Sequence, residues 1–154
     1  MYKILFVCHG NICRSPMAEF LFKDFVQKMG RENSFYVESA ATSREEIGNR
    51  VHYGTAAILD SYHIDYSKKR ARQMTRADYD KFDMIIYMDE YNLTNIERII
   101  GSDSMNKCYP LLHFAGLNRD ISDPWYTGNF IKTRDDILMG IEGLYSYLIK
   151  NNLC

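Results

Sequence analysis

The sequence contains few of the features that mark special classes of protein. It has only four cysteines in 154 residues, and they do not show the spacing of zinc ligands, so neither a disulfide scaffold nor a metal site is expected. No apolar run is long enough to cross a bilayer, and no secretory signal precedes the first predicted strand. The net charge of −1 provides no basic excess for binding nucleic acid. We therefore expect no metal, no membrane and no nucleic-acid partner, and a cytoplasmic location.

The chain also lacks internal repeats, low-complexity tracts and linkers. Its length therefore suits one domain over residues 1–154, with hydrophobic (46%) and charged (25%) fractions typical of a globular protein. Short apolar runs typical of buried strands alternate with amphipathic helical patterns. We expect strands at residues 4–7, 35–41, 84–88 and 107–112, and helices at 16–29, 54–62, 92–100 and 133–150. This alternation predicts an α/β fold with a parallel sheet and right-handed crossovers.

The most informative segment is CHGNICRS at residues 8–15, between the first strand and the first helix. Pro16 follows it and suits the first turn of a helix, where its missing N–H group costs nothing. A strand, a tight turn and a helix start direct several backbone N–H groups and the positive helix end at one point. The segment therefore predicts a binding site for an anion such as phosphate.

The residue types of this segment suit a phosphate loop that carries a nucleophile. Arg14 offers a planar pair of donors for two phosphate oxygens, and a helix start beside an arginine favours the thiolate of Cys8. Gly10 lets the backbone approach the anion, Asn11 tolerates a left-handed conformation, and Ser15 can donate its hydroxyl to the sulfur. A buried structural cysteine with an arginine nearby by chance is the alternative for a bare C-x5-R pattern. The strand before and the helix after favour the phosphate loop.

A second candidate segment, DPWYTG, lies at residues 123–128. The departing oxygen of a phosphate monoester leaves slowly unless it is protonated, so hydrolysis calls for a carboxylic acid opposite the nucleophile. Asp123 lies on a loop bounded by proline and glycine, and the rings of Trp125 and Tyr126 can desolvate its carboxyl and form walls for an aromatic leaving group. Alone, the segment would be an ordinary Asp-Pro turn. Together with the cysteine loop, it indicates a general acid.

These segments resemble the low-molecular-weight protein tyrosine phosphatases. Two segments follow the pattern of that family: VCHGNICRSPMAE at 7–19 and DPWY at 123–126. Three others resemble its intermediate segments: ESAATS at 38–43, ARQ at 71–73 and MDE at 88–90. The cysteine precedes the acid in the chain, as in this family and not in the larger tyrosine phosphatases. The resemblance implies a single-domain three-layer α/β sandwich of flavodoxin-like or Rossmann-like type. Its central four-stranded parallel sheet would have the strand order 2-1-3-4, with helices on both faces.

The resemblance also implies an activity and a set of site residues. The chain would hydrolyse phosphotyrosine and small aryl phosphates through a phosphocysteine intermediate, without a cofactor. Cys8 would be the nucleophile, Arg14 the phosphate clamp and Asp123 the general acid. The phosphate-binding loop would comprise His9, Gly10, Asn11, Ile12, Cys13, Arg14 and Ser15. Support for that loop would come from Asn11, Ser15, Ser39 and Asp89, with Asp89 helping to fix the arginine.

Three residues depart from the family pattern. His9 stands where many relatives carry an aliphatic residue, and Glu45 stands about where they place an aromatic wall residue. We expect the substrate pocket to be walled by His9, Glu45, Trp125 and Tyr126, with a substrate preference that the two departures alter. Lys69 lies near a position often held by a histidine that supports the phosphate loop.

The resemblance further implies that Cys13 is a redox partner of Cys8. A reversible disulfide between them would protect the nucleophile from over-oxidation. Alternatively, Cys13 only packs beneath the loop. The remaining histidines, at 52, 63 and 113, show no clustering, and the sequence assigns them no role.

Two other functions stay open at this point. One is arsenate reduction, which relatives of the same fold perform with further cysteines, although none lies between Cys13 and Cys108 here. The other is a catalytically silent phosphate-binding module, for which the cysteine and the acid would be unnecessary. The expected partner is a phosphotyrosine-containing protein, and the expected state is a monomer or weak dimer. Ile12 favours phosphotyrosine over phosphoarginine, because threonine tends to replace it in relatives that act on phosphoarginine.

Overall fold

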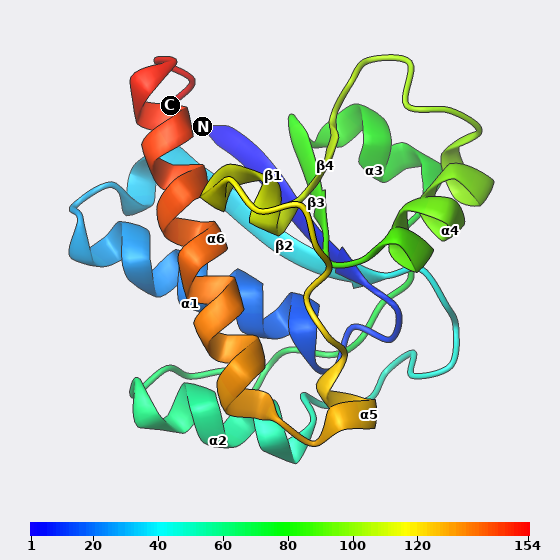
Figure 1. Cartoon of the computed structure of the whole chain (residues 1–154), viewed down its shortest axis with the longest axis vertical. Coiled ribbons are helices and arrows are strands. Elements are labelled where there is room, and N and C mark those ends of the chain that lie inside the picture. Colours follow the sequence, from blue (N-terminus) through cyan, green and yellow to red (C-terminus); the bar gives the residue numbers. More distant parts are fainter.

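Four parallel strands form the central sheet (Figure 1). The computed structural model describes residues 1–154, and the strand order is β2-β1-β3-β4. The strands are β1 (Tyr2–Cys8), β2 (Phe35–Ala41), β3 (Met84–Tyr87) and β4 (Cys108–Pro110). The predicted parallel sheet and its order 2-1-3-4 are therefore confirmed.

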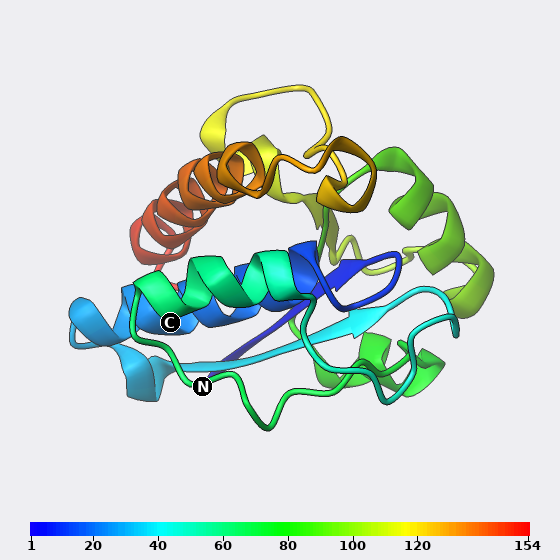
Figure 2. The ribbon, with the colours of Figure 1, turned by 90° about the horizontal axis from the view of Figure 1, so that it is seen from below.

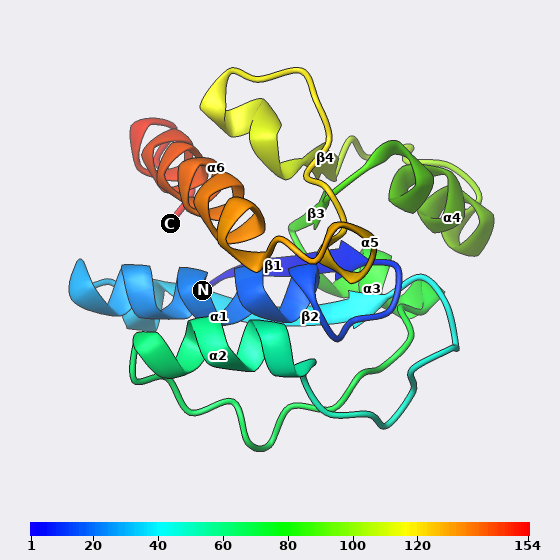
Figure 3. The same cartoon turned by 60° about the horizontal axis from the view of Figure 1, so that its bottom comes forward.

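Helices cover both faces of the sheet, as expected for a three-layer sandwich (Figures 2 and 3). Because side chains alternate along a strand, Ile4 and Phe6 of β1 join a core with α1, α2 and α6, whereas Leu5 and Val7 join a second core with α3 and α4. The helices are α1 (Arg14–Lys28), α2 (Tyr53–Ser61), α3 (Arg76–Lys81), α4 (Glu90–Ile100), α5 (Pro124–Thr127) and α6 (Phe130–Lys150), and the 3-10 turns are η1 (Glu32–Ser34) and η2 (Leu111–Ala115). None of these helices combines the length and the apolar character needed to span a membrane.

Three segments differ from the sequence expectation for local reasons. The expected loop at residues 123–128 contains the single-turn helix α5, because Asp123 caps it and Pro124 suits its first position. The fourth strand ends at Pro110 instead of continuing to residue 112, and Leu111 begins the turn η2, where it packs tightly against Gly140 of α6. Helix α3 was not expected from the sequence. It begins with a capping box between Thr75 and Asp78, which satisfies backbone groups at its start and permits so short a helix.

The carboxyl ends of β1 and β3 position the site. The strand order reverses between these neighbours, because the chain passes from β1 to β2 on one side and later to β3 on the other. Ligands of open α/β sheets bind at such a reversal. The phosphate loop follows β1, and Asp89 follows β3 as the N-cap of α4. Figure 1 shows α5 at this end of the molecule and both termini at the other.

Candidate active site

The phosphate loop presents unpaired backbone donors at the start of α1. The N-cap residue, Cys13, makes no side-chain hydrogen bond to the first turn, so the helix start is not capped by the protein. Within the chain, the N–H groups of Gly10, Ile12, Cys13 and Arg14 have no hydrogen-bond acceptor. Asn11 has a φ of 60°, the left-handed conformation expected from its place in the turn. A helix start of this kind can hold a tetrahedral anion.

The thiol of Cys8 lies within this ring of donors. It is a buried residue at the end of β1, and its Sγ atom accepts hydrogen bonds from the N–H groups of Asn11 and Ser15, both at 3.4 Å. The hydroxyl oxygen of Ser15 lies 3.0 Å from the sulfur. These three groups are placed to stabilise a negative charge on sulfur.

Asn11 connects the loop to the strand beside it. Its Nδ2 atom donates to the hydroxyl oxygens of Ser15 at 2.7 Å and Ser39 at 2.9 Å, and its Oδ1 atom accepts from the N–H group of Arg72 at 3.2 Å. Ser39 in turn donates to Oε1 of Glu19 at 2.6 Å. The predicted support residues Asn11, Ser15 and Ser39 thus form one buried hydrogen-bonded chain, which also includes the unpredicted Glu19.

Lys69 completes this chain beneath the loop. Its Nζ atom donates to the carbonyl oxygen of Ser39 at 2.9 Å and lies 3.6 Å from Oε1 of Glu19. Burial lowers the pKa of Lys69, although the charge of Glu19 opposes the shift. The sequence placed Lys69 near a supporting position, and the structure shows which groups it contacts.

Arg14 is fixed by acceptors from three segments. Its NH1 group donates to Oδ2 of Asp89 at 2.6 Å and to the carbonyl oxygen of Ile121 at 2.8 Å, and its NH2 group faces Oδ2 of Asp123 at 3.4 Å. Burial opposes the charge of Arg14, but the charges of Cys8, Asp89 and Asp123 more than offset this, so the pKa of the guanidinium is raised. The Nε atom is buried and has no partner within the protein. An oxyanion beside Cys8 would satisfy it.

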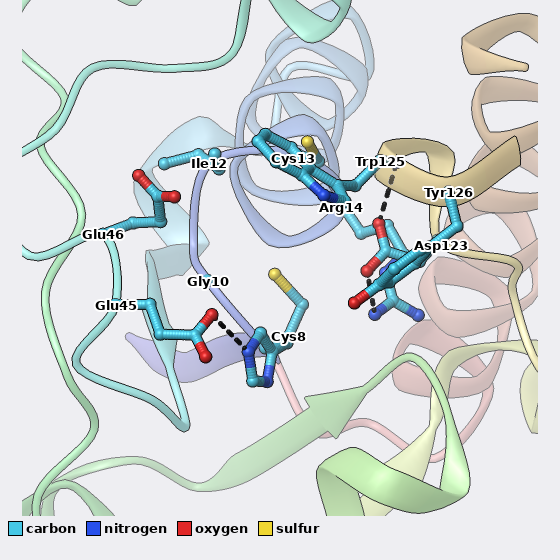
Figure 4. A pocket seen from close by; sticks show the side chains of 11 residues that line it. Cys8, Gly10, Ile12, Cys13, Arg14, Glu45, Glu46, Asp123, Trp125 and Tyr126 are labelled. Carbon is cyan, nitrogen blue, oxygen red and sulfur yellow. Dashed lines mark hydrogen bonds and ion pairs between the residues drawn. The ribbon is translucent and has the colours of Figure 1, made fainter. Parts of the chain in front are cut away.

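Asp123 is held at the start of α5, with its carboxyl group beside Arg14 (Figure 4). It is the N-cap of that single-turn helix, and its Oδ1 atom accepts from the N–H group of Trp125 at 3.0 Å. The rings that follow are exposed, Trp125 by 56% and Tyr126 by 83%. Asp123, Trp125 and Tyr126 therefore form one wall of the pocket that contains Cys8.

The opposite wall is acidic. Oε2 of Glu45 lies 2.8 Å from Nε2 of His9, and both side chains are well exposed. Glu46 lies beside it and also lines the pocket, which the sequence did not predict (Figure 4). The methylene group of Glu46 packs close to Gly10, where a Cβ atom would lie 3.4 Å from it. The predicted wall residues His9 and Glu45 thus lie opposite the predicted rings.

Cys13 lines the same pocket as Cys8 and is a free thiol. Burial, together with the charge of Cys8, raises the pKa of Cys13 to about 12, so it stays protonated near neutral pH. Its role as a redox partner stays a prediction. Cys108 and Cys154 are half-buried and distant from this pocket in the fold.

All the predicted site residues except Ser39 line this pocket or hydrogen-bond to residues that do, and Ser39 is joined to the pocket through Asn11. Sequence reasoning missed Glu19, Glu46 and His52. Glu19 is the last residue of the segment VCHGNICRSPMAE, which resembles the family pattern, and this was the available signal, whereas nothing local distinguishes the other two. His52 contacts both Ile12 and Trp125, and these contacts depend on the tertiary fold.

Known proteins match this chain over nearly its whole length. The family model described as "Low molecular weight phosphotyrosine protein phosphatase" matches residues 3–153. The low molecular weight protein-tyrosine-phosphatase YfkJ of Bacillus subtilis is 39% identical over 152 residues, with 97% of each chain covered. Its crystal structure superposes with a TM-score of 0.94 at 38% identity, covering 98% of this chain and 96% of the other.

A second solved structure is a low molecular weight protein tyrosine phosphatase from Streptococcus pyogenes. It gives a TM-score of 0.85 at 40% identity, with 96% of this chain and 93% of that chain covered. The match to the family model extends over nearly the whole sequence, and it includes both the cysteine loop and the segment that carries Asp123. This chain belongs to the low molecular weight phosphotyrosine protein phosphatase family.

Proposed function

We propose that this protein tyrosine phosphatase removes phosphate from tyrosine side chains of phosphoproteins in two steps, with Cys8 as nucleophile, Arg14 as clamp and Asp123 as acid and then base. The observation that carries the proposal is the buried Cys8 sulfur inside a ring of unpaired backbone N–H groups, with the unpartnered Nε atom of Arg14 nearby. Such an arrangement binds a tetrahedral dianion and places phosphorus against sulfur.

In the first step, the Cys8 thiolate attacks phosphorus and the bond between phosphorus and the phenol oxygen breaks. The Asp123 carboxyl group gives its proton to the departing oxygen, so tyrosine leaves as a neutral phenol. The loop N–H groups and the guanidinium of Arg14 hold the equatorial oxygens as their charge spreads. The pair between Arg14 and Asp89 at 2.6 Å keeps the guanidinium plane in place.

In the second step, water attacks the phosphocysteine and gives a proton to the Asp123 carboxylate. The bond between phosphorus and sulfur breaks, inorganic phosphate forms, and the Cys8 thiolate is restored. Ser15 stabilises the departing thiolate by donating a hydrogen bond to it, because its hydroxyl oxygen lies 3.0 Å from the sulfur. The reaction therefore balances with water as its only second reactant.

The pocket walls favour a flat aromatic ester. The rings of Trp125 and Tyr126 stand on one side and the carboxylates of Glu45 and Glu46 on the other, above a phosphate site at the bottom. A phosphotyrosine side chain is long enough to place its phosphate on the loop while its ring lies between these walls. The phosphoprotein substrate, a monomeric or weakly dimeric state and a cytoplasmic location stay predictions.

Phosphate release from p-nitrophenyl phosphate at mildly acidic pH tests the proposal, with wild type and Cys8→Ser side by side under reducing conditions. We expect turnover by the wild type, and a loss of at least about 10⁴-fold in the variant, because a serine hydroxyl lacks the nucleophilicity of a thiolate. The variant should still bind inorganic phosphate, since the loop N–H groups and Arg14 are unchanged. A folded wild-type protein without turnover would contradict the proposal and favour a phosphate-binding module.

A further inference from the structure

His52 lies where three segments around the pocket meet. Its ring stacks on Tyr53 at a centroid distance of 4.2 Å and on Phe130 at 5.2 Å, and meets the edge of Trp125 at 5.5 Å. Phe130 is the first residue of α6, and Trp125 belongs to α5, the helix that begins directly after Asp123. The imidazole therefore packs on the segment that carries the proposed acid.

The backbone of the same residue contacts the phosphate loop. The N–H group of His52 donates to the carbonyl oxygen of Ile12 at 2.9 Å. One turn later, the hydroxyl of Thr55 donates to the carbonyl oxygen of Cys13 at 3.0 Å. The start of α2 is thereby joined to the second half of the phosphate loop, and His52 contacts both sides of the active site at once.

The surrounding residues leave little freedom to the ring. The Nδ1 atom of His52 accepts from the N–H group of Gly54 at 3.0 Å and so caps α2. At Gly54, a Cβ atom would lie 2.4 Å from the ring of Phe130, so only glycine lets α2 approach α6 this closely. The cap fixes one end of the imidazole while Tyr53 and Phe130 hold its two faces.

We propose that His52 is a positioning residue, which sets Trp125 and the adjoining Asp123 at the correct distance from the phosphate loop. The proposal rests on the role of Asp123 as the general acid. Three contacts couple these groups. The N–H group of His52 binds the carbonyl oxygen of Ile12 in the phosphate loop, and the His52 ring contacts Trp125. The N–H group of Trp125 in turn donates to the Asp123 carboxylate at 3.0 Å. His52 itself does not contact the substrate.

The charge state of the ring agrees with this role. Only a neutral imidazole can accept at Nδ1 from Gly54, so the proton of the ring lies on Nε2. Burial lowers the pKa of His52, while the charges of Glu46 and Asp123, the acidic groups that face it, act in the opposite direction. The neutral form therefore holds the stack at neutral pH.

Two substitutions separate the ring from the cap. His52→Asn keeps a side-chain acceptor for the N–H group of Gly54 but removes the stacking, and His52→Phe keeps the stacking but removes the acceptor. We expect kcat/KM for phenyl phosphate to fall about tenfold in His52→Asn, because a small displacement of the acid is costly for catalysis. For 2,4-dinitrophenyl phosphate, whose leaving group needs no proton, we expect a change of less than about twofold. His52→Phe should retain both rates and lose thermal stability.

Trp125 provides a second measurement that does not depend on turnover. It is the only tryptophan in the chain, so the intrinsic fluorescence at tryptophan wavelengths reports on this segment alone. We expect the steady-state anisotropy of Trp125 to fall in His52→Asn and to stay near the wild-type value in His52→Phe. His113→Asn is the matched control, because His113 also stacks on a neighbouring ring, that of Tyr109, but in the segment of η2.

Asp123→Asn, which preserves the cap of α5, is measured on the same two esters. A loss confined to phenyl phosphate in Asp123→Asn and in His52→Asn, with the fall in anisotropy, supports the proposal. Equal slowing of both esters by His52→Asn, or unchanged anisotropy and rates, overturns the role of His52 while leaving the acid assignment intact. Equal slowing by Asp123→Asn overturns the acid assignment and the proposal together.

Discussion

The phosphate loop and the wall of the pocket that carries Asp123 reach their positions in different ways. The loop takes all its residues from positions 8–15, and all but His9 and Gly10 are buried. Its side chains are joined by short hydrogen bonds that continue to Ser39 and Lys69. The wall that carries Asp123 is formed by α5, which packs against His52 at the start of α2. Trp125 and Tyr126 are largely exposed there, and an edge-to-face contact between Trp125 and His52 takes the place of side-chain hydrogen bonds.

This difference separates two tasks of the enzyme. A tetrahedral dianion has a fixed shape, so its site gains from donors that are held rigidly before the anion arrives. The proposed leaving group is a tyrosine on a protein chain, and the wall around it must then admit a large partner. The exposed ring of Tyr126 meets that need, since it can adjust while His52 holds Trp125 and the phosphate loop keeps its shape.

Among the variants that test this comparison, Arg14→Lys is expected to lower the activity most. A lysine keeps the positive charge but cannot donate to Asp89, to the carbonyl oxygen of Ile121 and to two phosphate oxygens at once. We expect kcat/KM for p-nitrophenyl phosphate to fall about 10²- to 10³-fold. Steady-state kinetics with the folded variant provide the measurement.

The matched change on the exposed wall is Tyr126→Leu. It removes a ring that is 83% exposed and makes no hydrogen bond in the protein, so we expect a loss of about tenfold or less. If the two variants lost activity equally, the contrast between a rigid anion site and an adjustable wall would be wrong.

The sequence predicted the phosphate loop and the sheet better than it predicted the contacts around them. The phosphate loop was predictable because its chemistry needs a cysteine, an arginine and small residues at fixed spacing, and all of them are contiguous. The central sheet was predictable from its apolar runs. The partners of Lys69 and His52 were not, because each contact joins segments whose distance depends on how several helices pack. The short helix α3 was missed because its capping box begins no apolar periodic segment.

A smaller effect, on stability, is expected from Lys69→Met. The ammonium group is nearly buried and donates to the carbonyl oxygen of Ser39, and it lies beside Glu19 beneath the loop. Methionine fills a similar volume but leaves that carbonyl without its donor and Glu19 with Lys23 as its remaining cation. We expect the free energy of unfolding to fall by about 1 to 3 kcal/mol, measured by urea denaturation.

Lys68→Met is the control for this change. The neighbouring lysine is exposed, so its replacement should alter the free energy of unfolding by no more than about 0.5 kcal/mol. Equal effects at the two positions would mean that Lys69 does not support the loop, and that the hydrogen-bonded chain ends at Ser39.

The smallest effect is expected at the exposed contact between His9 and Glu45, which is an ion pair when the imidazole is protonated and which joins the phosphate loop to the acidic wall. The side chains are 44% and 68% exposed, so water screens their interaction despite the distance of 2.8 Å. A double-mutant cycle with His9→Gln and Glu45→Gln should give a coupling energy below about 1 kcal/mol, decreasing as salt is added. A coupling as large as the loss in Lys69→Met, and insensitive to salt, would show that the loop and the acidic wall are one rigid unit. A weak coupling instead means that the wall formed by Glu45 can move away from His9 when a protein substrate binds, while the phosphate loop keeps its shape.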